Sequence, residues 1–540
     1  METNIYDILV IVIFVVGILG TAFWKGRGKR ETSGEYFISK GTLPWWVIGA
    51  AFVASGMNTE QLVGINGISY KIGLPIVNCY VIVWVVYSLL IFIFLPVYLK
   101  NGIVTMPEYV SRRFSPLNAN IFTVMLLLSY IFLSLAVVLY GGAKLLEVVM
   151  GLKLFWGVAA LGIVAGLYTM YGGMAAQSYA AVVQFVMIFT AGAVLFILAY
   201  LQLPNGWSDV VANSPCGFHI MRPANYPEVP WQAIPASLLG LQLYYSCINQ
   251  SLVQRCFGAK TQWDAKMAII FAGFAVAMRP FVEILPGIMA RALSTINPQF
   301  DLTGQSIDNT FPTLIKVLVP VGFRGLILIG TLAIVMSCTS ALLNSISTLF
   351  TMDIYKKWFR KAAGEHEMVK VGTIATLVLT VFSIFYAPYV GKLGGSIFNY
   401  FQTGAAFFAV PVATIFIFGF FWKRSSPAAA LFTLITAIPI GIWLTMVGIP
   451  HIFSAETVAK YSLTNRYIAS GITQGVCAVL FIIISLLTKP KPVESIASLM
   501  WTKDCLYLPK NEPKRPLLQS LGFWWVIFVL MYLIIYAVYW

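Results

Sequence analysis

Long runs of apolar residues recur along the chain from one end to the other. Each run is about 20 residues long, the length that an α-helix needs to cross the hydrocarbon core of a bilayer. A membrane β-barrel would instead alternate apolar and polar residues over about ten positions. We therefore expect an all-α polytopic membrane protein. About fourteen transmembrane helices are predicted, near residues 5–24, 44–68, 75–99, 119–143, 155–171, 176–201, 232–252, 267–292, 323–352, 370–388, 394–421, 427–447, 466–488 and 520–540.

The first run begins "METNIYDILVIVIF", with acidic residues before it and the basic cluster "KGRGKR" after it. A secretory signal peptide has the opposite charge order, so this run is expected to stay in the protein as an anchor. Lys and Arg are retained on the cytoplasmic side of membrane proteins. With the N-terminus outside, most of the 35 basic residues fall in cytoplasmic loops. The prediction is a protein of the cytoplasmic (inner) membrane with both termini outside.

The composition mainly argues against other classes of protein. The 540 residues are 59% hydrophobic and 10% charged, and the net charge of +15 follows from the topology, with no indication of nucleic-acid binding and no protein partner inferred. The seven Cys form no CxxC or Cys/His cluster, and the three His fall in predicted loops, which argues against metal and redox sites. The sequence also lacks the common hydrolase, protease and nucleotide-binding motifs, so we expect no enzyme.

Two predicted spans are interrupted by small and polar residues. The second contains "AAFVASGMNTEQLVGINGISY" and the seventh contains "LLGLQLYYSCINQS", and their starts are five spans apart. Such segments in corresponding positions of two halves indicate an inverted repeat, whose discontinuous helices expose backbone carbonyls near the membrane midplane. Polar residues also form hydrogen bonds between packed membrane helices, and this role would explain any single one of these residues. Their clustering favours a buried solute site in a secondary transporter.

Six stretches carry a family resemblance: "EYFISKGTLPWWVIGA", "EQLVGINGISYKIGLP", "YTMYGG", "NQSLVQRCFGAKT", "LLNSISTLFTMDIYKKW" and "FGFFWKR". The chain resembles the sodium:solute symporters, most closely their bacterial sodium/galactose branch. The resemblance implies the leucine-transporter-type fold, with a core of five plus five inverted-repeat helices that works by alternating access. It divides the chain into an anchor helix and basic loop (1–43), a transport core (44–426), and accessory helices (427–540) that include a cytoplasmic linker (489–519).

The resemblance also implies a sodium site. Matched residue by residue, the family's ligands fall on the carbonyl oxygens of Ala54, Met57 and Ile334 and on the side chains of Ser337 and Cys338. Cys338 stands where the branch usually has a second Ser, and a thiol is a poor ligand for a hard cation such as Na⁺. A second departure is Ala181, which replaces an Asp that follows the "YGG" stretch in the family.

A solute site is implied in the same way. The family's positions fall on Gln61, Gln242 and Gln402, with Tyr245 as a gate beneath the solute and Phe398 as an outer aromatic lid. Glutamine amides offer donors and acceptors to hydroxyl groups. The branch's Glu on its second core helix falls on Tyr80, and its Lys falls on Val276, so galactose itself is not implied.

Arg279 lies one turn beyond Val276, with Glu283 four residues further on. Two interpretations of Arg279 stay open. It either forms a neutral pair with Glu283 on one helix face, as intramembrane charges must, or it binds the carboxylate of a sugar acid.

The leading hypothesis is therefore a symporter that imports a sugar, polyol or sugar acid together with Na⁺. The alternatives are a symporter of another organic solute such as a carboxylate or vitamin, a uniporter or differently coupled transporter, and a membrane sensor that no longer transports.

Overall fold

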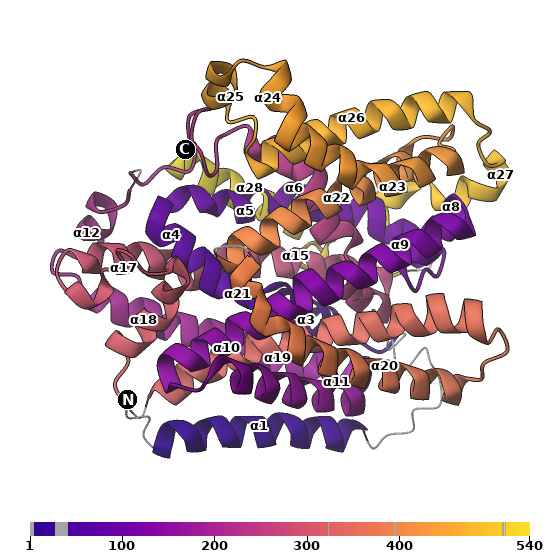
Figure 1. Cartoon of the computed structure of the whole chain (residues 1–540). Coiled ribbons are helices and arrows are strands. Elements are labelled where there is room, and N and C mark those ends of the chain that lie inside the picture. Colours follow the sequence, from indigo (N-terminus) through magenta and orange to yellow (C-terminus); the bar gives the residue numbers. More distant parts are fainter. Residues whose placement is uncertain are drawn as a thin grey trace.

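The computed structural model describes residues 5–26, 41–215, 217–321, 323–393, 396–509, 512–513 and 515–540. Within these ranges the regular structure is helical, and the one β-type pairing is an isolated bridge between Leu43 and Ala259. Figure 1 shows α1 (Ile5–Gly26) along one edge of the assembly, beside α11 (Leu154–Leu201) and α19 (Arg324–Leu349), with α23 (Pro427–Trp443) and α26 (Arg466–Leu487) on the opposite side. The expected all-α class is confirmed.

Ten helices in the described ranges are long and apolar enough to cross a membrane: Leu74–Lys100, Pro116–Met150, Gln177–Leu201, Gln262–Ser294, Arg324–Phe359, Glu365–Tyr389, Ile397–Phe421, Pro427–Ile452, Arg466–Leu487 and Leu521–Tyr539. Three shorter apolar helices, Ile5–Gly17, Trp45–Gly56 and Leu154–Leu167, fall within three more of the predicted spans. The remaining predicted span, the seventh at 232–252, consists of several short helical pieces. Every predicted span therefore lies on helical structure, although the count of fourteen is not itself confirmed.

The second predicted span is broken, as its polar residues indicated. Helix α3 (Trp45–Gly56) ends where Met57 adopts an extended conformation (φ −89°, ψ 109°). The chain resumes as a π-helical segment, η1 (Glu60–Ile65), and continues as α4 (Asn66–Ile72). The last carbonyl groups of a helix have no partners within it. The break consequently leaves backbone oxygens near Met57 available inside the protein.

The seventh predicted span is broken in the same manner. It runs through α13 (Ala233–Ser237) and two π-helical segments, η5 (Leu238–Gln242) and η6 (Tyr244–Ile248), before α14 (Gln250–Val253). Asn249 is extended (φ −61°, ψ 113°), and its side-chain oxygen caps α14 by accepting a hydrogen bond from the Ser251 backbone N–H at 3.1 Å. Two broken helices five spans apart are what an inverted-repeat transporter requires.

Helix α11 differs from expectation. The sequence predicts two separate helices, 155–171 and 176–201, whereas the structure has one continuous element of 48 residues. The Gln177 Nε2 donates to the Thr169 carbonyl at 3.5 Å. In a straight helix residues eight apart are separated by about 12 Å along the axis, so the element bends sharply between them. The two predicted spans are its two arms, and helical hydrogen bonding continues through the bend because no Pro interrupts it.

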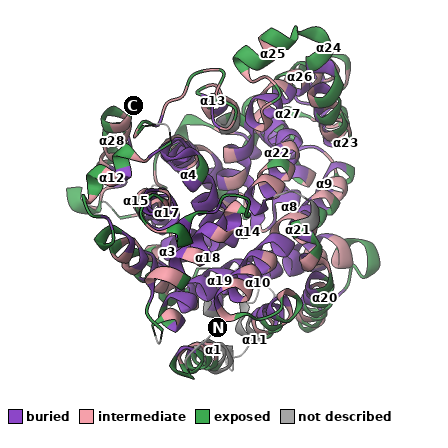
Figure 2. Ribbon diagram, turned by 60° about the vertical axis from the view of Figure 1, so that its left-hand side comes forward, coloured by how far each residue is buried: buried purple, intermediate pink, exposed green. Residues whose placement is uncertain are grey.

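Burial divides central helices from peripheral ones. Figure 2 shows the buried residues concentrated around α19 and α10 (Ala136–Met150), with exposed residues on the outer helices.

The peripheral α28 (Leu521–Tyr539) packs on α15 (Gln262–Met278). The Tyr532 hydroxyl donates to the Gly273 carbonyl at 2.9 Å, and Phe528 covers Gly273 so closely that a Cβ there would lie 2.2 Å from its ring. A larger residue than Gly at position 273 would push this helix off.

Candidate functional site

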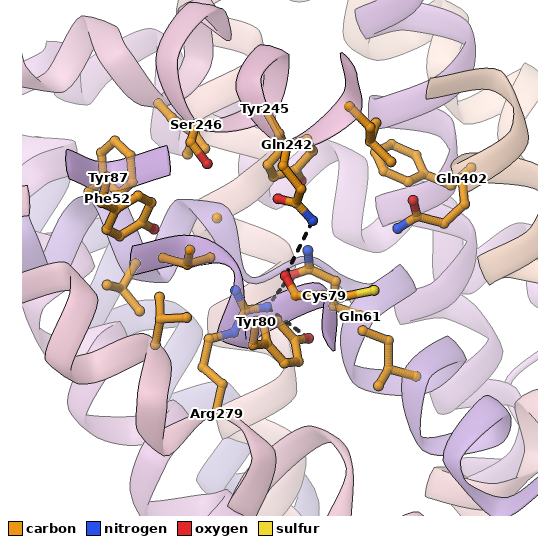
Figure 3. A pocket seen from close by; sticks show the side chains of 18 residues that line it. Phe52, Gln61, Cys79, Tyr80, Tyr87, Gln242, Tyr245, Ser246, Arg279 and Gln402 are labelled. Atoms are coloured by element: carbon orange, nitrogen blue, oxygen red, sulfur yellow. Dashed lines mark hydrogen bonds between the residues drawn. The ribbon is translucent and has the colours of Figure 1, made fainter. Parts of the chain in front are cut away.

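A polar cavity lies between the two broken helices. Its volume is about 60 Å³, which exceeds the roughly 10–15 Å³ that a cavity needs to admit one water. Figure 3 shows side chains from α3, η1, α5 (Asn78–Val81), η5, η6 and α22 (Ile397–Phe421) converging on it. Six of the seven expected solute-site residues line it: Gln61, Tyr80, Gln242, Tyr245, Arg279 and Gln402.

Arg279 is the centre of a buried hydrogen-bond network. Its Nε lies 3.1 Å from Glu283 Oε2 and its Nη2 lies 3.0 Å from Glu283 Oε1, so the two side chains form a two-pronged ion pair. Nη2 also donates to the side-chain oxygen of Gln61, Oε1, and, at 3.3 Å, to the Tyr80 hydroxyl. The guanidinium lies over the Tyr80 ring, 4.4 Å from its centroid. Glu283 is fully buried, and this geometry agrees with the paired interpretation of Arg279.

The three glutamines differ in how far they are engaged. The side-chain oxygen of Gln61 accepts from Arg279. The Gln242 Nε2 donates to the backbone carbonyl of Cys79 at 3.2 Å. The Gln402 Nε2 donates to Glu60 Oε1 at 3.1 Å. In Figure 3 the Gln402 amide points toward the cavity. The cavity is therefore lined by amides that can both donate to and accept from hydroxyl groups.

Aromatic side chains lie on either side of the cavity. The Tyr245 hydroxyl accepts from the Asn58 side-chain amide at 3.3 Å, and its ring packs edge-on against Phe401, 6.4 Å between centroids. Phe398, the expected lid, is not among the described residues that line the cavity. It lies beneath Arg466 of α26, whose guanidinium is 5.5 Å from the Phe398 ring centroid. An accessory helix thus covers the expected lid.

The expected sodium ligands are brought together where α3 ends. Ala54 and Met57 lie on the two sides of that end, and Ile334, Ser337 and Cys338, at positions i, i+3 and i+4, share one face of α19. The Cys338 Sγ is 2.8 Å from the Met57 carbonyl oxygen, 3.2 Å from that of Ser55 and 3.9 Å from that of Ala54. Three backbone oxygens therefore converge on one side chain.

The donor chemistry of this cluster fits a hard cation in all but one member. Carbonyl and hydroxyl oxygens suit Na⁺, and a thiol does not. The Ser337 hydroxyl oxygen is 3.3 Å from that of Ser55, which adds oxygen donors beside the carbonyls. Ala181 is buried, and its methyl side chain offers no oxygen to an ion. The site consists of neutral groups, in which the thiol takes the place of one oxygen.

Polar contacts also hold the N-terminal end of α22. Asp308 Oδ2 accepts from the Ile397 backbone N–H at 3.0 Å, at the first residue of that helix. Burial raises the pKa of Asp308 to about 6, against the lowering effects of the Ile397 hydrogen bond and of Lys144. Glu228 accepts from Lys71 at 2.8 Å and from Arg466 at 3.3 Å. Asp308 therefore connects a loop to the helix that carries Gln402, and Glu228 connects a loop to α4 and α26.

Glu60 is the residue that sequence reasoning left without a role. It is fully buried in η1, and it binds Gln402 across the junction between η1 and α22. A charged residue at membrane depth is a functional hypothesis by default, and that signal was available in the sequence. The pairing with Gln402 was not, because 342 residues separate the two along the chain.

A family model described as the sodium:solute symporter family matches residues 36–437. Over 492 residues the chain is 32% identical to a sodium/glucose cotransporter of Vibrio parahaemolyticus, covering 86% of this chain and 89% of that protein. It is 30% identical to the sodium/glucose cotransporter 1 of Sus scrofa, covering 92% and 81%, and 30% identical to the sodium/myo-inositol cotransporter 2 of Oryctolagus cuniculus, covering 92% and 78%.

Two solved structures share the fold. A substrate-bound, outward-open Na⁺-coupled sialic acid symporter superposes with a TM-score of 0.77 at 19% identity, covering 91% of this chain and 99% of that one. A nucleobase-cation-symport-1 family transporter in a closed conformation superposes with a TM-score of 0.53 at 13% identity, covering 87% and 98%. At these identities the likeness supports the architecture of two broken helices around a central cavity.

Proposed function

The chain belongs to the sodium:solute symporter family, and we propose that it imports an uncharged sugar or polyol together with Na⁺ by alternating access. It is a transporter and not an enzyme. The observation that carries the proposal is the amide-lined cavity between two helices that break at Met57 and Asn249. The relatives named for glucose and myo-inositol support the choice of a polyhydroxylated solute.

The choice of an uncharged solute rests on Arg279. Of the described residues that line the cavity, it is the one with a cationic side chain, and both prongs of its guanidinium are taken by Glu283. A solute carboxylate would have to displace a fully buried Glu283, which would leave that carboxylate without a partner. Leaving a buried charge unpaired costs about 3–5 kcal/mol. A sugar acid is therefore a poorer fit than a neutral sugar.

Na⁺ is the second cargo, and we place it among Ala54, Met57, Ile334, Ser337 and Cys338. Two of these residues belong to the end of α3 and three to α19. Because α3 also carries Phe52, Val53 and Gly56 to the solute cavity, an ion that fixes the end of α3 also fixes one wall of that cavity. Ion and solute then favour each other insofar as both bind the same conformation more tightly.

We further propose that the protein lies in the cytoplasmic (inner) membrane with both termini outside and with residues 44–426 as its transport core. The distribution of Lys and Arg supports this orientation. The basic loop after α1, which belongs to this proposal, falls at residues 27–40 and so outside the described residues. The comparisons favour neither a uniporter nor a sensor over the symporter.

Uptake into proteoliposomes tests the function. We expect labelled glucose or myo-inositol to accumulate above equilibrium when Na⁺ is directed inward, and accumulation to stop when an ionophore dissipates the gradient. Labelled glucuronate is the charged control and should not accumulate. Equilibration that ignores the gradient would refute coupling, and accumulation of glucuronate in preference to glucose would refute the neutral solute.

A further inference from the structure

An apolar groove of about 430 Å³ lies between α20 (Glu365–Tyr386) and the π-helical segment η10 (Phe350–Phe359). The two elements belong to consecutive helices that are long and apolar enough to cross a membrane. Figure 2 shows α20 at the edge of the molecule, with exposed residues on its outer side. Ile374 and Val378, which line the groove, are both exposed. The groove therefore faces away from the protein core.

The groove is about as long as one leaflet of a bilayer is deep. Its lining on α20 runs from Val371 to Leu379, and eight helical residues span about 12 Å along the axis. Half of the hydrocarbon core of a bilayer is about 15 Å thick. The exposed Trp358 lies at the end nearest the loop between η10 and α20, and tryptophan is typical of the membrane–water interface. The groove thus runs from the interface into the hydrocarbon of one leaflet, which is where a phospholipid acyl chain lies.

The loop end of the groove carries an excess of positive charge. Residues 350–379 contain five Lys and Arg and three Asp and Glu. Two of the basic residues are paired within the protein, Lys357 with Asp353 and Arg360 with Glu367 at 2.8 Å. Glu367 Oε1 also accepts from the Tyr355 hydroxyl at 2.6 Å. Three further lysines are accessible and form no ion pair with the described residues: Lys356, Lys361 and Lys370.

These lysines stand at the end of the groove that lies at the interface. Lys356 follows Tyr355 in η10, and Lys370 precedes Val371 in α20, so both elements that line the groove carry a lysine there. Lys361 lies in the loop that joins them. The orientation proposed above places this loop on the cytoplasmic side, where anionic lipids give the leaflet a negative surface potential. An apolar groove and a basic cluster at its mouth together match a lipid with an anionic headgroup.

We propose that this groove binds one acyl chain of an anionic phospholipid, whose phosphate is bound by Lys356, Lys361 and Lys370. A zwitterionic lipid would fill the groove but give the three lysines no net negative charge to bind. A free anion would bind the lysines but leave the groove empty. The groove is lined by none of the residues of the solute and ion sites, so the inference goes beyond the proposed function and stands without it.

Lipid titrations of the purified full chain in detergent, followed by native mass spectrometry, test the proposal. We expect phosphatidylglycerol to bind at least tenfold more tightly than phosphatidylcholine with the same acyl chains. One basic residue near an anionic surface contributes roughly a factor of five. Lys356→Gln, Lys361→Gln and Lys370→Gln combined should therefore weaken phosphatidylglycerol binding at least tenfold and leave phosphatidylcholine binding unchanged.

The matched control for the lysines is a second triple variant, Lys423→Gln, Lys489→Gln and Lys503→Gln. It removes three exposed lysines from other loops on the same proposed side of the membrane, so it has the same net charge as the first variant. It should bind phosphatidylglycerol as the natural protein does. An equal loss in both triple variants, or equal affinity of the natural protein for the two lipids, would overturn the inference.

A second pair of variants tests the groove itself. Val378→Trp fills the groove from an exposed position, and Val381→Trp adds the same bulk at an exposed position of α20 outside the groove. We expect Val378→Trp to weaken phosphatidylglycerol binding at least fivefold and Val381→Trp to leave it unchanged. Equal binding by the two variants would show that no acyl chain enters the groove. Displacement of the lipid by inorganic phosphate would instead identify a free-anion site, and either result overturns the inference while the proposed transport function stands.

Discussion

Replacing Cys338 by Ser should strengthen Na⁺ dependence. The Cys338 sulfur lies 2.8 Å from the Met57 carbonyl oxygen and 3.2 Å from that of Ser55, so a hydroxyl placed there would be near enough to these oxygens to share one ion with them. A bond to a charged group contributes about 1.5–3 kcal/mol, and desolvating the new hydroxyl offsets part of this gain. A net gain near 1.4 kcal/mol corresponds to about a tenfold lower Na⁺ concentration at half-maximal uptake.

The assay is glucose uptake into proteoliposomes across a series of external Na⁺ concentrations. Cys247→Ser is the matched control, because Cys247 is equally buried and donates to the Val86 carbonyl at 3.4 Å, outside the proposed ion site. The control should leave the Na⁺ dependence unchanged and report any general cost of burying a hydroxyl. An unchanged Na⁺ midpoint in Cys338→Ser, with uptake intact, would refute the proposed place of the ion.

Three further outcomes are expected. Arg279→Gln should lower the free energy of unfolding in detergent by about 3–5 kcal/mol because it leaves Glu283 buried and unpaired, and Arg279→Gln combined with Glu283→Gln should recover most of that loss in a thermal melt. Asp308, whose pKa burial raises to about 6 from 3.8, should stabilise the packing of its loop on α22 fully below pH 3.8 and lose that contribution as the pH rises through 6. Melts of Asp308→Asn from pH 4 to 8 should lack this slope, and a slope equal to the natural one would contradict the assignment. Glu228→Gln should release Lys71 and Arg466, the two cations that it bridges, so a membrane-impermeant maleimide should label Cys79 in the cavity about two- to fivefold faster, an increase that Cys79→Ser should abolish.

The fold followed closely from sequence because the signals for it are local. Apolar runs gave the helices, and the small and polar residues around Met57 and Asn249 marked both breaks. Where α11 bends, the sequence predicted a loop between two helices, because a run of small residues is also typical of loops. Whether a helix stops or bends at such a run depends on the helices packed around it, which sequence periodicity does not describe.

The site was predicted less completely because its partners come from distant segments. Arg279 and Glu283 are four residues apart, so their pairing was open to prediction. Glu60 and Gln402 join segments 342 residues apart, and no local pattern links them. The covering of Phe398 by Arg466 likewise depends on how an accessory helix packs. The family resemblance indicated individual residues of the site, and the structure shows which residues each of them contacts.

The packing of α28 on α15 has a consequence for how the protein is made. The Gly273 carbonyl accepts its hydrogen bond from Tyr532, which a ribosome adds 259 residues later. At about 5–20 residues per second, roughly 13–50 s pass between the synthesis of the two residues. During that interval the Gly273 carbonyl lacks the donor that it has in the finished protein. The other helices are therefore synthesised before α28 packs on α15. A slower synthesis of α28 would prolong the time for which an incompletely packed transporter remains in the membrane.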